Sequence, residues 1–231
     1  MTAARQAEHA AAEPDALRVG VLAYPGCFAS EVFGVPDLLT MAGHVAGPDA
    51  PTGYQVSIVS PRRRVTASGG TRLDVRPVRE VDVLVVPGFE LAPDTDLDAQ
   101  LARLAPEIAA IRAQAATGTA VVSLCVGSFL LAQAGLLDRR RATTSWLHAA
   151  ELARRCPNTD VRPEHLVVTD TGVTTTAAFS AMYDFALDLI RRHNGAGVAR
   201  ATARLALVDD ARTSHTGSRP SAYRGAFRRT T

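Results

Sequence analysis

The stretch that decides the fold is Ala120-Val-Val-Ser-Leu-Cys125-Val126-Gly-Ser-Phe-Leu-Leu-Ala132, an apolar strand that passes directly into a helix. At such a joint the first N–H groups of the helix and the positive end of its dipole face the end of the strand. A thiol placed there is expected to ionise easily and to act as a nucleophile, with the adjacent N–H groups stabilising an oxyanion. The alternative is an inert core cysteine. The position of Cys125 at the strand end argues against it.

The rest of the chain alternates strand patterns with helical ones. Strands are predicted at Leu17–Ala23, Tyr54–Ser60, Val83–Val86, Ala120–Leu124 and Val173–Thr176, with a hairpin over Val65–Val75. Helices are predicted at Ser30–Ala42, along one apolar stripe from Leu97 to Ile111, from Val126 to near Gly135, and at Trp146–Arg155, Ser180–His193 and Gly197–Leu207. This order predicts an α/β fold in which a mainly parallel sheet is covered by helices on both faces.

One domain is expected over residues 17–208. The chain has 231 residues, of which 47% are hydrophobic, and this suits one sizeable α/β core. Residues 1–16 are Ala-rich and carry charges, and residues 209–231 are polar and basic without periodicity. Both segments are therefore predicted to be flexible tails.

Composition argues against several classes of function. The net charge of +2 is too small to suggest a nucleic-acid binder, and no apolar stretch is long enough to cross a membrane. All 25 basic residues are Arg, which excludes a Schiff-base or P-loop lysine. Three cysteines without paired spacing, and no signal-peptide pattern, predict a cytoplasmic protein. The histidines lack metal-ligand spacing and no phosphate loop is present, so neither a metal nor a cofactor is expected.

Three loops are expected to meet at one edge of the sheet. In a parallel sheet, ligands bind outside the carboxyl ends of the strands, where Glu31, Gly88-Phe89 and Cys125-Val126 are predicted to lie. Burial and a nearby thiolate both raise the pKa of a carboxyl group. Glu31 is therefore expected to stay protonated, to donate to the sulfur, and to act as general acid and base. The alternative is an exposed acid at a helix N-terminus.

Several motifs, taken in this order, resemble the ThiJ/PfpI superfamily. They are Tyr24-Pro-Gly-Cys-Phe-Ala-Ser-Glu31-Val-Phe-Gly-Val-Pro36, Val81-Asp-Val-Leu-Val-Val-Pro-Gly88, Ser123-Leu-Cys125-Val-Gly-Ser-Phe-Leu-Leu-Ala-Gln-Ala-Gly-Leu-Leu137, Arg141-Ala-Thr-Thr-Ser145-Trp146 and Gly172-Val-Thr-Thr-Thr-Ala177. The matches span about Leu17 to Leu207. The branches that the chain resembles are isonitrile hydratase and the amidase-like sensor domains of AraC-type transcriptional regulators.

The resemblance implies a flavodoxin-like three-layer α/β/α sandwich, usually dimeric, with the nucleophile on a strained turn called the nucleophile elbow. By motif position it implies that Cys125 is the reactive cysteine and Glu31 its acidic partner. It also implies that the N–H groups of Phe89 and Val126 are the oxyanion donors. The other residues expected to line the site are Gly88, Ser145 and Trp146.

The chain departs from the family pattern at three positions. Val126 stands where protease-like members carry His and isonitrile hydratases usually carry Thr. Ser145 stands where many relatives carry the His of an Ala-Thr-Thr-His motif, and Phe89 replaces a motif glycine. A Cys–His pair therefore requires that His44, His148 or His165 reach the site. The other reading makes each of these a surface or capping histidine.

Two functions are consistent with these residues. The first is a cofactor-independent, isonitrile hydratase-like enzyme in which Cys125 adds to a small electrophile and Glu31 supplies acid and base catalysis. The second is a non-catalytic small-molecule sensor, related to AraC-type regulators but lacking their helix-turn-helix domain. Both predict a small-molecule ligand and a homodimer.

Overall fold

The computed structural model describes residues 16–48, 53–92 and 94–208. Of the two predicted tails, residues 1–15 and 209–231 lie outside these ranges.

Seven strands form the main sheet, in the order β10-β11-β7-β6-β1-β2-β5. They are β1 (Leu17–Leu22), β2 (Tyr54–Ser60), β5 (Arg76–Pro77), β6 (Val83–Val86), β7 (Ala120–Ser123), β10 (Val167–Asp170) and β11 (Val173–Thr176). Neighbouring strands are parallel except for β10 and β11, which are antiparallel. The prediction of a mainly parallel sheet is therefore confirmed.

Two small sheets lie outside this one. Strands β3 (Arg64–Thr66) and β4 (Arg72–Asp74) pair antiparallel, which confirms the predicted hairpin. Strands β8 (Arg141–Ala142) and β9 (Asp160–Val161) pair in parallel.

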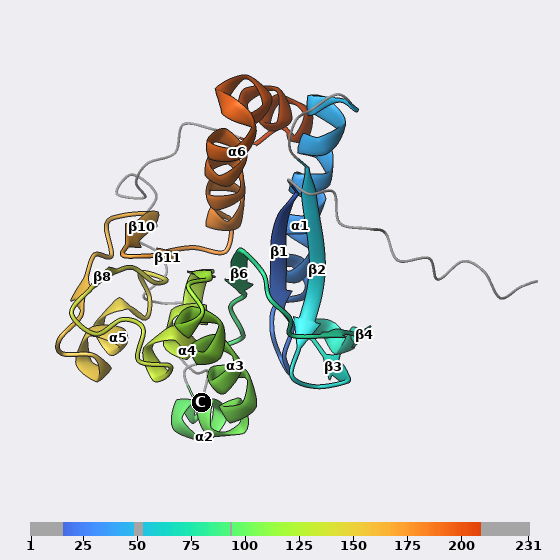
Figure 1. Cartoon of the computed structure of the whole chain (residues 1–231). Coiled ribbons are helices and arrows are strands. Elements are labelled where there is room, and N and C mark those ends of the chain that lie inside the picture. Colours follow the sequence, from blue (N-terminus) through green and yellow to red (C-terminus); the bar gives the residue numbers. More distant parts are fainter. Residues whose placement is uncertain (1–15, 49–52, 93, 209–231) are drawn as a thin grey trace, which may run out of the picture.

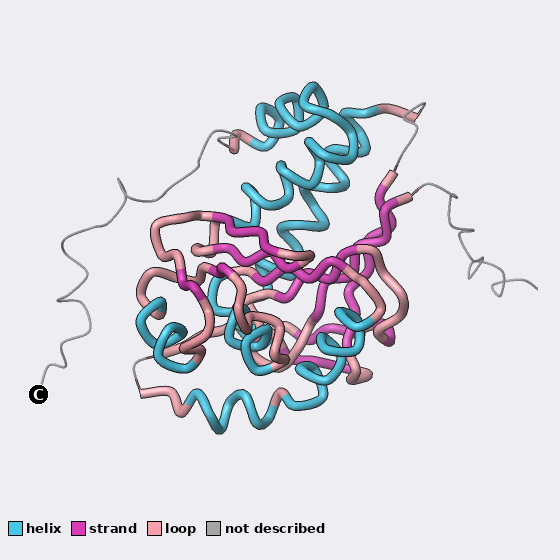
Figure 2. The backbone as a smooth tube through the Cα atoms, turned by 60° about the vertical axis from the view of Figure 1, so that its left-hand side comes forward, coloured by secondary structure: helices cyan, strands magenta, loops and turns pink. Residues whose placement is uncertain are grey.

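The helices form two layers with the sheet between them, as Figures 1 and 2 show. They are α1 (Ala29–Ala46), α2 (Leu97–Arg103), α3 (Ala105–Ala116), α4 (Ser128–Gln133), α5 (Ala149–Arg155) and α6 (Ala181–Ala206), with short 3-10 turns η1 (Ser68–Gly70) and η2 (Cys125–Gly127). Helices α1 and α6 pack against each other on one face of the sheet, and the group α2 to α5 lies on the other. This is the predicted three-layer α/β/α arrangement.

Several helix boundaries differ from the sequence prediction. The stripe expected to form one helix is divided between α2 and α3 because Pro106 fits only the first turn of a helix, and α3 begins at Ala105. Helix α1 begins one residue early and continues past Gly43 to Ala46. The two helices expected at the C-terminal end are joined in α6, with Gly195 (φ 89°) breaking the helical conformation between them.

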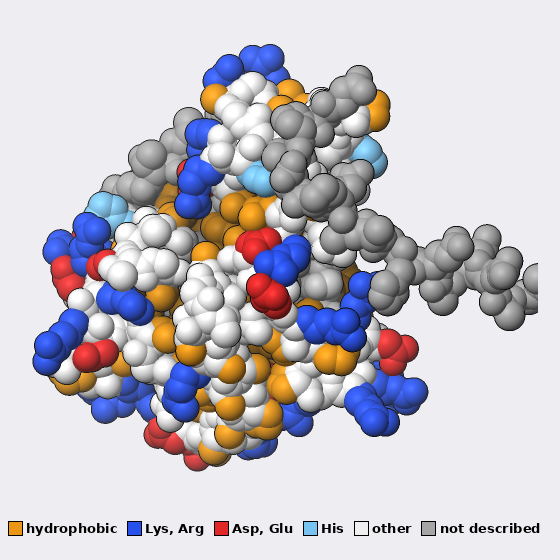
Figure 3. All heavy atoms as spheres, in the orientation of Figure 1, with side chains coloured by type: hydrophobic (Ala, Val, Ile, Leu, Met, Phe, Trp, Pro, Cys, Tyr) orange, Lys and Arg blue, Asp and Glu red, His pale blue; other side chains and the backbone are white. Residues whose placement is uncertain are grey.

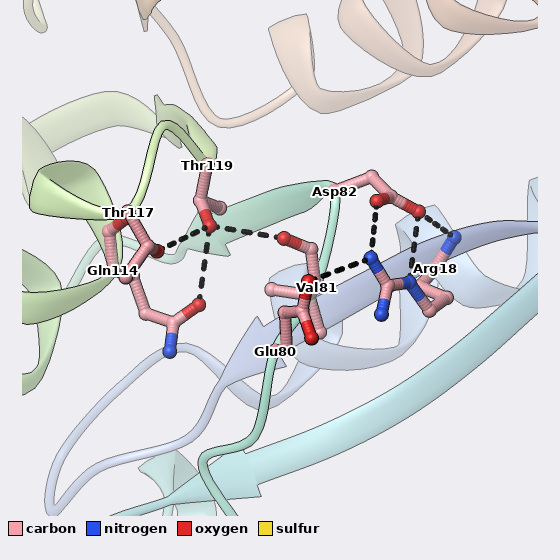
Figure 4. A network of polar contacts seen from close by, with 7 residues as sticks. All are labelled: Arg18, Glu80, Val81, Asp82, Gln114, Thr117 and Thr119. Atoms are coloured by element: carbon pink, nitrogen blue, oxygen red, sulfur yellow. Dashed lines mark hydrogen bonds and ion pairs between the residues drawn. The ribbon is translucent and has the colours of Figure 1, made fainter.

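A polar network holds the amino ends of β1, β6 and β7 together (Figure 4). The guanidinium of Arg18 contacts Asp82 at 2.7 Å, and Asp82 also accepts from the Arg18 N–H at 2.8 Å. The Thr119 hydroxyl donates to the carbonyl oxygen of Val81 at 2.9 Å. These contacts lie at the edge opposite Cys125, so they support the strand register without taking part in the site.

Charged side chains are dispersed on the surface. On the face drawn in Figure 3, Arg side chains are scattered among Asp and Glu. Arg62 contacts the fully buried Glu107 at 2.5 Å, so this arginine of the Arg62-Arg63-Arg64 run has a structural partner. None of the helices in the described ranges combines the length and the apolar character that a bilayer crossing requires.

Candidate active site

Cys125 occupies a strained turn between β7 and α4. Its φ of 49° lies in the left-handed region, which costs a residue with a side chain about 1–2 kcal/mol. Hydroxyl groups from three parts of the chain satisfy its backbone. The Cys125 N–H donates to the Thr176 hydroxyl at 3.3 Å, and its carbonyl oxygen accepts from Thr144 at 3.1 Å and Ser128 at 3.3 Å. We call Ser128, Thr144 and Thr176 the hydroxyl clamp.

Two glycines let the loops approach this turn. A Cβ on Gly127 would lie 2.6 Å from the carbonyl oxygens of Val86 and Pro87, which is too close for any side chain. A Cβ on Gly88 would lie 3.2 Å from the Glu31 carboxyl and 3.3 Å from the Cβ of Cys125. Gly88 therefore lies against both predicted catalytic residues, as expected for loops that meet at one edge of the sheet.

Glu31 lies in the first turn of α1 and is fully buried. Its Oε2 accepts from the Gly88 N–H at 2.5 Å, and its Oε1 is a buried atom without a hydrogen-bond partner among the described residues. Burial raises the pKa of Glu31 to about 7, against the opposing effect of the Gly88 N–H. The prediction of a raised pKa is confirmed, and the alternative of an exposed helix-terminal acid is wrong.

The expectation that Cys125 ionises easily is wrong for the resting site. Burial, followed by the charge of Glu31, raises the pKa of the Cys125 thiol to about 12. The Val126 N–H and the Ser145 hydroxyl, as hydrogen-bonding groups, lower this pKa, but their effects are weaker. A 3-10 turn follows Cys125, and α4 itself has 6 residues. Desolvation is the largest influence on the pKa of this thiol.

The other predicted site residues occupy different environments. Ser145 and Val126 lower the pKa of the Cys125 thiol, whereas the Gly88 N–H donates to Glu31. Phe89 is fully buried, and its ring packs edge-on against Tyr24 at 6.4 Å. Trp146 is 38% exposed, so it is not a core residue. The roles of the Phe89 and Val126 N–H groups as oxyanion donors remain predictions.

Histidine does not contribute to the pKa of the thiol within the part of the chain that the structure describes. His148 donates its backbone N–H to the Ser145 carbonyl, and burial lowers the pKa of its ring. His165 is exposed beside Glu164, at 3.5 Å, and His44 lies in the last turn of α1. The described ranges also contain no cluster of three His, Cys, Asp or Glu side chains suited to a metal ion.

Cys27 is buried and unpaired. Its sulfur accepts from the Tyr24 N–H at 3.5 Å, and burial raises the pKa of its thiol to about 11. The Tyr24 hydroxyl donates to the Pro87 carbonyl and so holds the loop that carries Gly88. The sequence patterns indicated no role for Tyr24 or for the hydroxyl clamp. The one available signal for the clamp was that small hydroxyl residues lie at the ends of apolar segments.

Comparison with known proteins matches residues 18–192 to the model of the DJ-1/PfpI family. An isonitrile hydratase from Pseudomonas putida is 31% identical over 192 residues, which cover 80% of this chain and 75% of that protein. The HTH-type transcriptional regulator ArgR of Pseudomonas aeruginosa is 32% identical over 100 residues, which cover 43% of this chain and only 30% of the regulator.

A solved structure shares the fold. The crystal structure of an AraC family transcriptional regulator from Pseudomonas putida superposes with a TM-score of 0.66 at 23% identity, covering 82% of this chain and 99% of that chain. The likeness agrees with the flavodoxin-like α/β architecture expected from the sequence.

Proposed function

Because the chain belongs to the DJ-1/PfpI family, we propose that it is a cysteine-dependent, isonitrile hydratase-like enzyme acting on a small uncharged electrophile. The observation that carries the proposal is the pairing of Cys125, on a left-handed turn, with the fully buried Glu31, whose Oε1 lacks a partner among the described residues. A buried polar atom without a partner costs about 1–3 kcal/mol. Among the described residues Gln100, Ser123 and Thr202 also carry such an atom, so what distinguishes Glu31 is the position of its carboxyl group against Gly88, which itself lies against Cys125. A substrate or the reacting thiol is a suitable partner for this oxygen.

The first step joins sulfur to the isonitrile carbon. The raised pKa of the Cys125 thiol means that the resting sulfur carries its proton, and the ionised form of Glu31, whose pKa is raised to about 7, is the neighbouring base that can take this proton while the C–S bond forms. Glu31 takes the thiol proton as the C–S bond forms and returns it to the same carbon. The product of this step is a thioimidate, R–N=CH–S–Cys125.

The second step adds water and releases the sulfur. Glu31 takes a proton from water as the water oxygen attacks the thioimidate carbon, and Glu31 passes this proton to the nitrogen. The C–S bond of the adduct, R–NH–CH(OH)–S–Cys125, then breaks, the hydroxyl proton passes to the sulfur, and the carbon keeps the oxygen as a carbonyl. The product is an N-formamide, R–NH–CHO, so the net change is the addition of one water molecule. In this proposal the Phe89 and Val126 N–H groups stabilise the adduct oxygen.

Ser145 supports this assignment. Isonitrile hydratases usually carry a Thr after the cysteine, a hydroxyl that Val126 lacks. The Ser145 hydroxyl, from a different loop, acts as a hydrogen-bonding group that lowers the pKa of the Cys125 thiol. We propose that it orients the sulfur. A nitrile, an amide or a reactive carbonyl compound is an alternative electrophile for the same residues.

The second candidate is a ligand sensor without catalysis. The sequence similarity to ArgR favours it, although the aligned part spans less than a third of that regulator. A sensor needs only binding at the site, and the high pKa of the Cys125 thiol is compatible with a sulfur that does not react.

Turnover measurements separate the two candidates. Wild type and Cys125→Ala are incubated with panels of isonitriles, nitriles and 2-oxoaldehydes, and product is quantified by mass spectrometry. Product that depends on Cys125 supports the enzyme. Ligand binding that survives the substitution, without turnover in either protein, supports the sensor. The variant Glu31→Leu serves as the acid–base test, since the proposed coupling requires it to change the pH dependence of Cys125 alkylation.

We propose a cytoplasmic location, and the three unpaired cysteines are consistent with a reducing compartment. We also propose that residues 17–208 form the functional domain and that it acts as a homodimer, which sedimentation analysis tests.

A further inference from the structure

Two aromatic side chains lie at the same edge of the sheet as Cys125. Phe28 and Phe179 pack edge-to-face, with ring centroids 6.0 Å apart and an interplanar angle of 81°. Phe28 is the N-cap residue of α1, and Phe179 lies between β11 and α6. Phe179 is 43% exposed, so this apolar pair faces solvent. Pairs of this kind contribute binding energy when an apolar group covers them.

Backbone contacts tie this pair to the catalytic residues. The Phe28 N–H donates to the Gly88 carbonyl at 2.9 Å, and its own carbonyl accepts from the Glu31 N–H at 3.1 Å. Phe179 follows Thr176 by three residues, and the Thr176 hydroxyl accepts from the Cys125 N–H. The pair therefore joins the segment that carries Glu31 to the segment that supports Cys125.

The groups that influence the thiol are uncharged or negatively charged. The groups that act on the pKa values of Cys125, Glu31 and Cys27 are carboxyl, backbone and hydroxyl groups, and no Arg or His of the described ranges is among them. An anionic ligand would therefore enter a desolvated site without a compensating positive charge.

We infer that Phe28 and Phe179 form a subsite for the aryl or branched-alkyl substituent of an uncharged electrophile that reacts at Cys125. The inference rests on the proposed function in taking Cys125 as the reacting group, and it specifies the substrate class. The aromatic surface binds the apolar substituent, and the uncharged reactive carbon lies at the sulfur.

Alkylation rates test the inference without requiring turnover. The protein carries Cys156→Ser, because Cys156 is the other partly exposed thiol. Iodoacetate, iodoacetamide and N-phenyl iodoacetamide are compared by intact mass, each rate being divided by the rate with free glutathione. The phenyl reagent is expected to react fastest and iodoacetate slowest, with a phenyl preference of about fivefold to tenfold over iodoacetamide. Equal normalised rates for the three reagents would overturn the inference.

Two substitutions make the test specific. Phe179→Ala should remove most of the phenyl preference, measured in the same protein as the ratio of the N-phenyl iodoacetamide rate to the iodoacetamide rate. Phe33→Ala is the matched control, because Phe33 is 37% exposed on α1 and makes no part of the proposed subsite. If Phe33→Ala lowers the preference as much as Phe179→Ala, the subsite is wrong.

Varying the protein concentration distinguishes a ligand subsite from an interface between two copies of the chain. A phenyl preference that appears only on dilution would assign the aromatic pair to a contact between two copies of the chain, and the inference would be wrong. A preference without isonitrile turnover would instead leave the subsite intact and contradict only the proposed enzyme.

Discussion

The substitution Glu31→Gln measures the free energy that is needed to ionise the buried carboxyl group of Glu31. Glutamine has nearly the same shape, and its side-chain oxygen retains an acceptor for the Gly88 N–H, but it has no proton to lose. The wild-type carboxyl has its pKa raised from 4.5 to about 7 by burial. The difference between the two proteins therefore isolates the cost of ionising Glu31 in the folded state.

The sign of the effect follows from proton linkage. Below pH 4.5 both the folded and the unfolded wild-type chains carry the Glu31 proton, and the stability due to its raised pKa is fully present. As the pH rises from 4.5, the unfolded chain loses the proton first, so the free energy of unfolding falls until the folded chain also ionises near pH 7. At about 1.4 kcal/mol for each tenfold change in the dissociation constant, the loss amounts to about 3 kcal/mol.

Urea unfolding at a series of pH values measures this loss. Relative to wild type, Glu31→Gln should become more stable by about 3 kcal/mol between pH 4.5 and pH 7. Other titrating groups are common to both proteins and cancel in the difference.

A second buried acid provides the control. Glu107 is as buried as Glu31, but Arg62 contacts it at 2.5 Å. Glu107→Gln breaks this pair and should destabilise the protein at neutral pH. If the Glu31→Gln difference is the same at every pH, Glu31 is not a buried acid with a raised pKa, and the proposed proton transfers lose their basis.

Three further substitutions test how the turn at Cys125 is built. Thr176→Val removes the acceptor of the Cys125 N–H, so urea unfolding should show a loss of about 1–3 kcal/mol, and a loss near zero would mean that the hydroxyl clamp is dispensable. Cys125→Gly should be more stable than Cys125→Ala by about 1 kcal/mol, since glycine tolerates a φ of 49°; equal stabilities would contradict the strain. Gly127→Ala places a Cβ 2.6 Å from the Pro87 carbonyl oxygen and should cost about 3 kcal/mol or more, whereas an unchanged melting temperature would show that the loop moves freely.

Much of the site could be predicted from local sequence patterns. The apolar run ending at Cys125 predicted both the central strand and the turn, because parallel strands and the helices that follow them have distinct hydrophobic spacings. The convergence of Glu31, Gly88 and Cys125 followed from the rule that carboxyl ends of parallel strands share one edge.

Other features were missed because their signals are weak. Strand β10 is short, and an edge position leaves it without the continuous apolar pattern of a central strand. The division between α2 and α3 was readable from Pro106, but the apolar stripe continued across it and suggested one helix.

The sequence by itself determined the α/β class, the order of the elements and the identity of the two groups that face each other, since these depend on spacing along the chain. Only the tertiary structure decided the protonation of those groups and the contacts that hold them. The pKa of Cys125 rises, contrary to the local expectation, because desolvation sums over neighbours from distant segments. The hydroxyls that hold its backbone come from Ser128, Thr144 and Thr176, and packing rather than sequence proximity brings two of them to the turn.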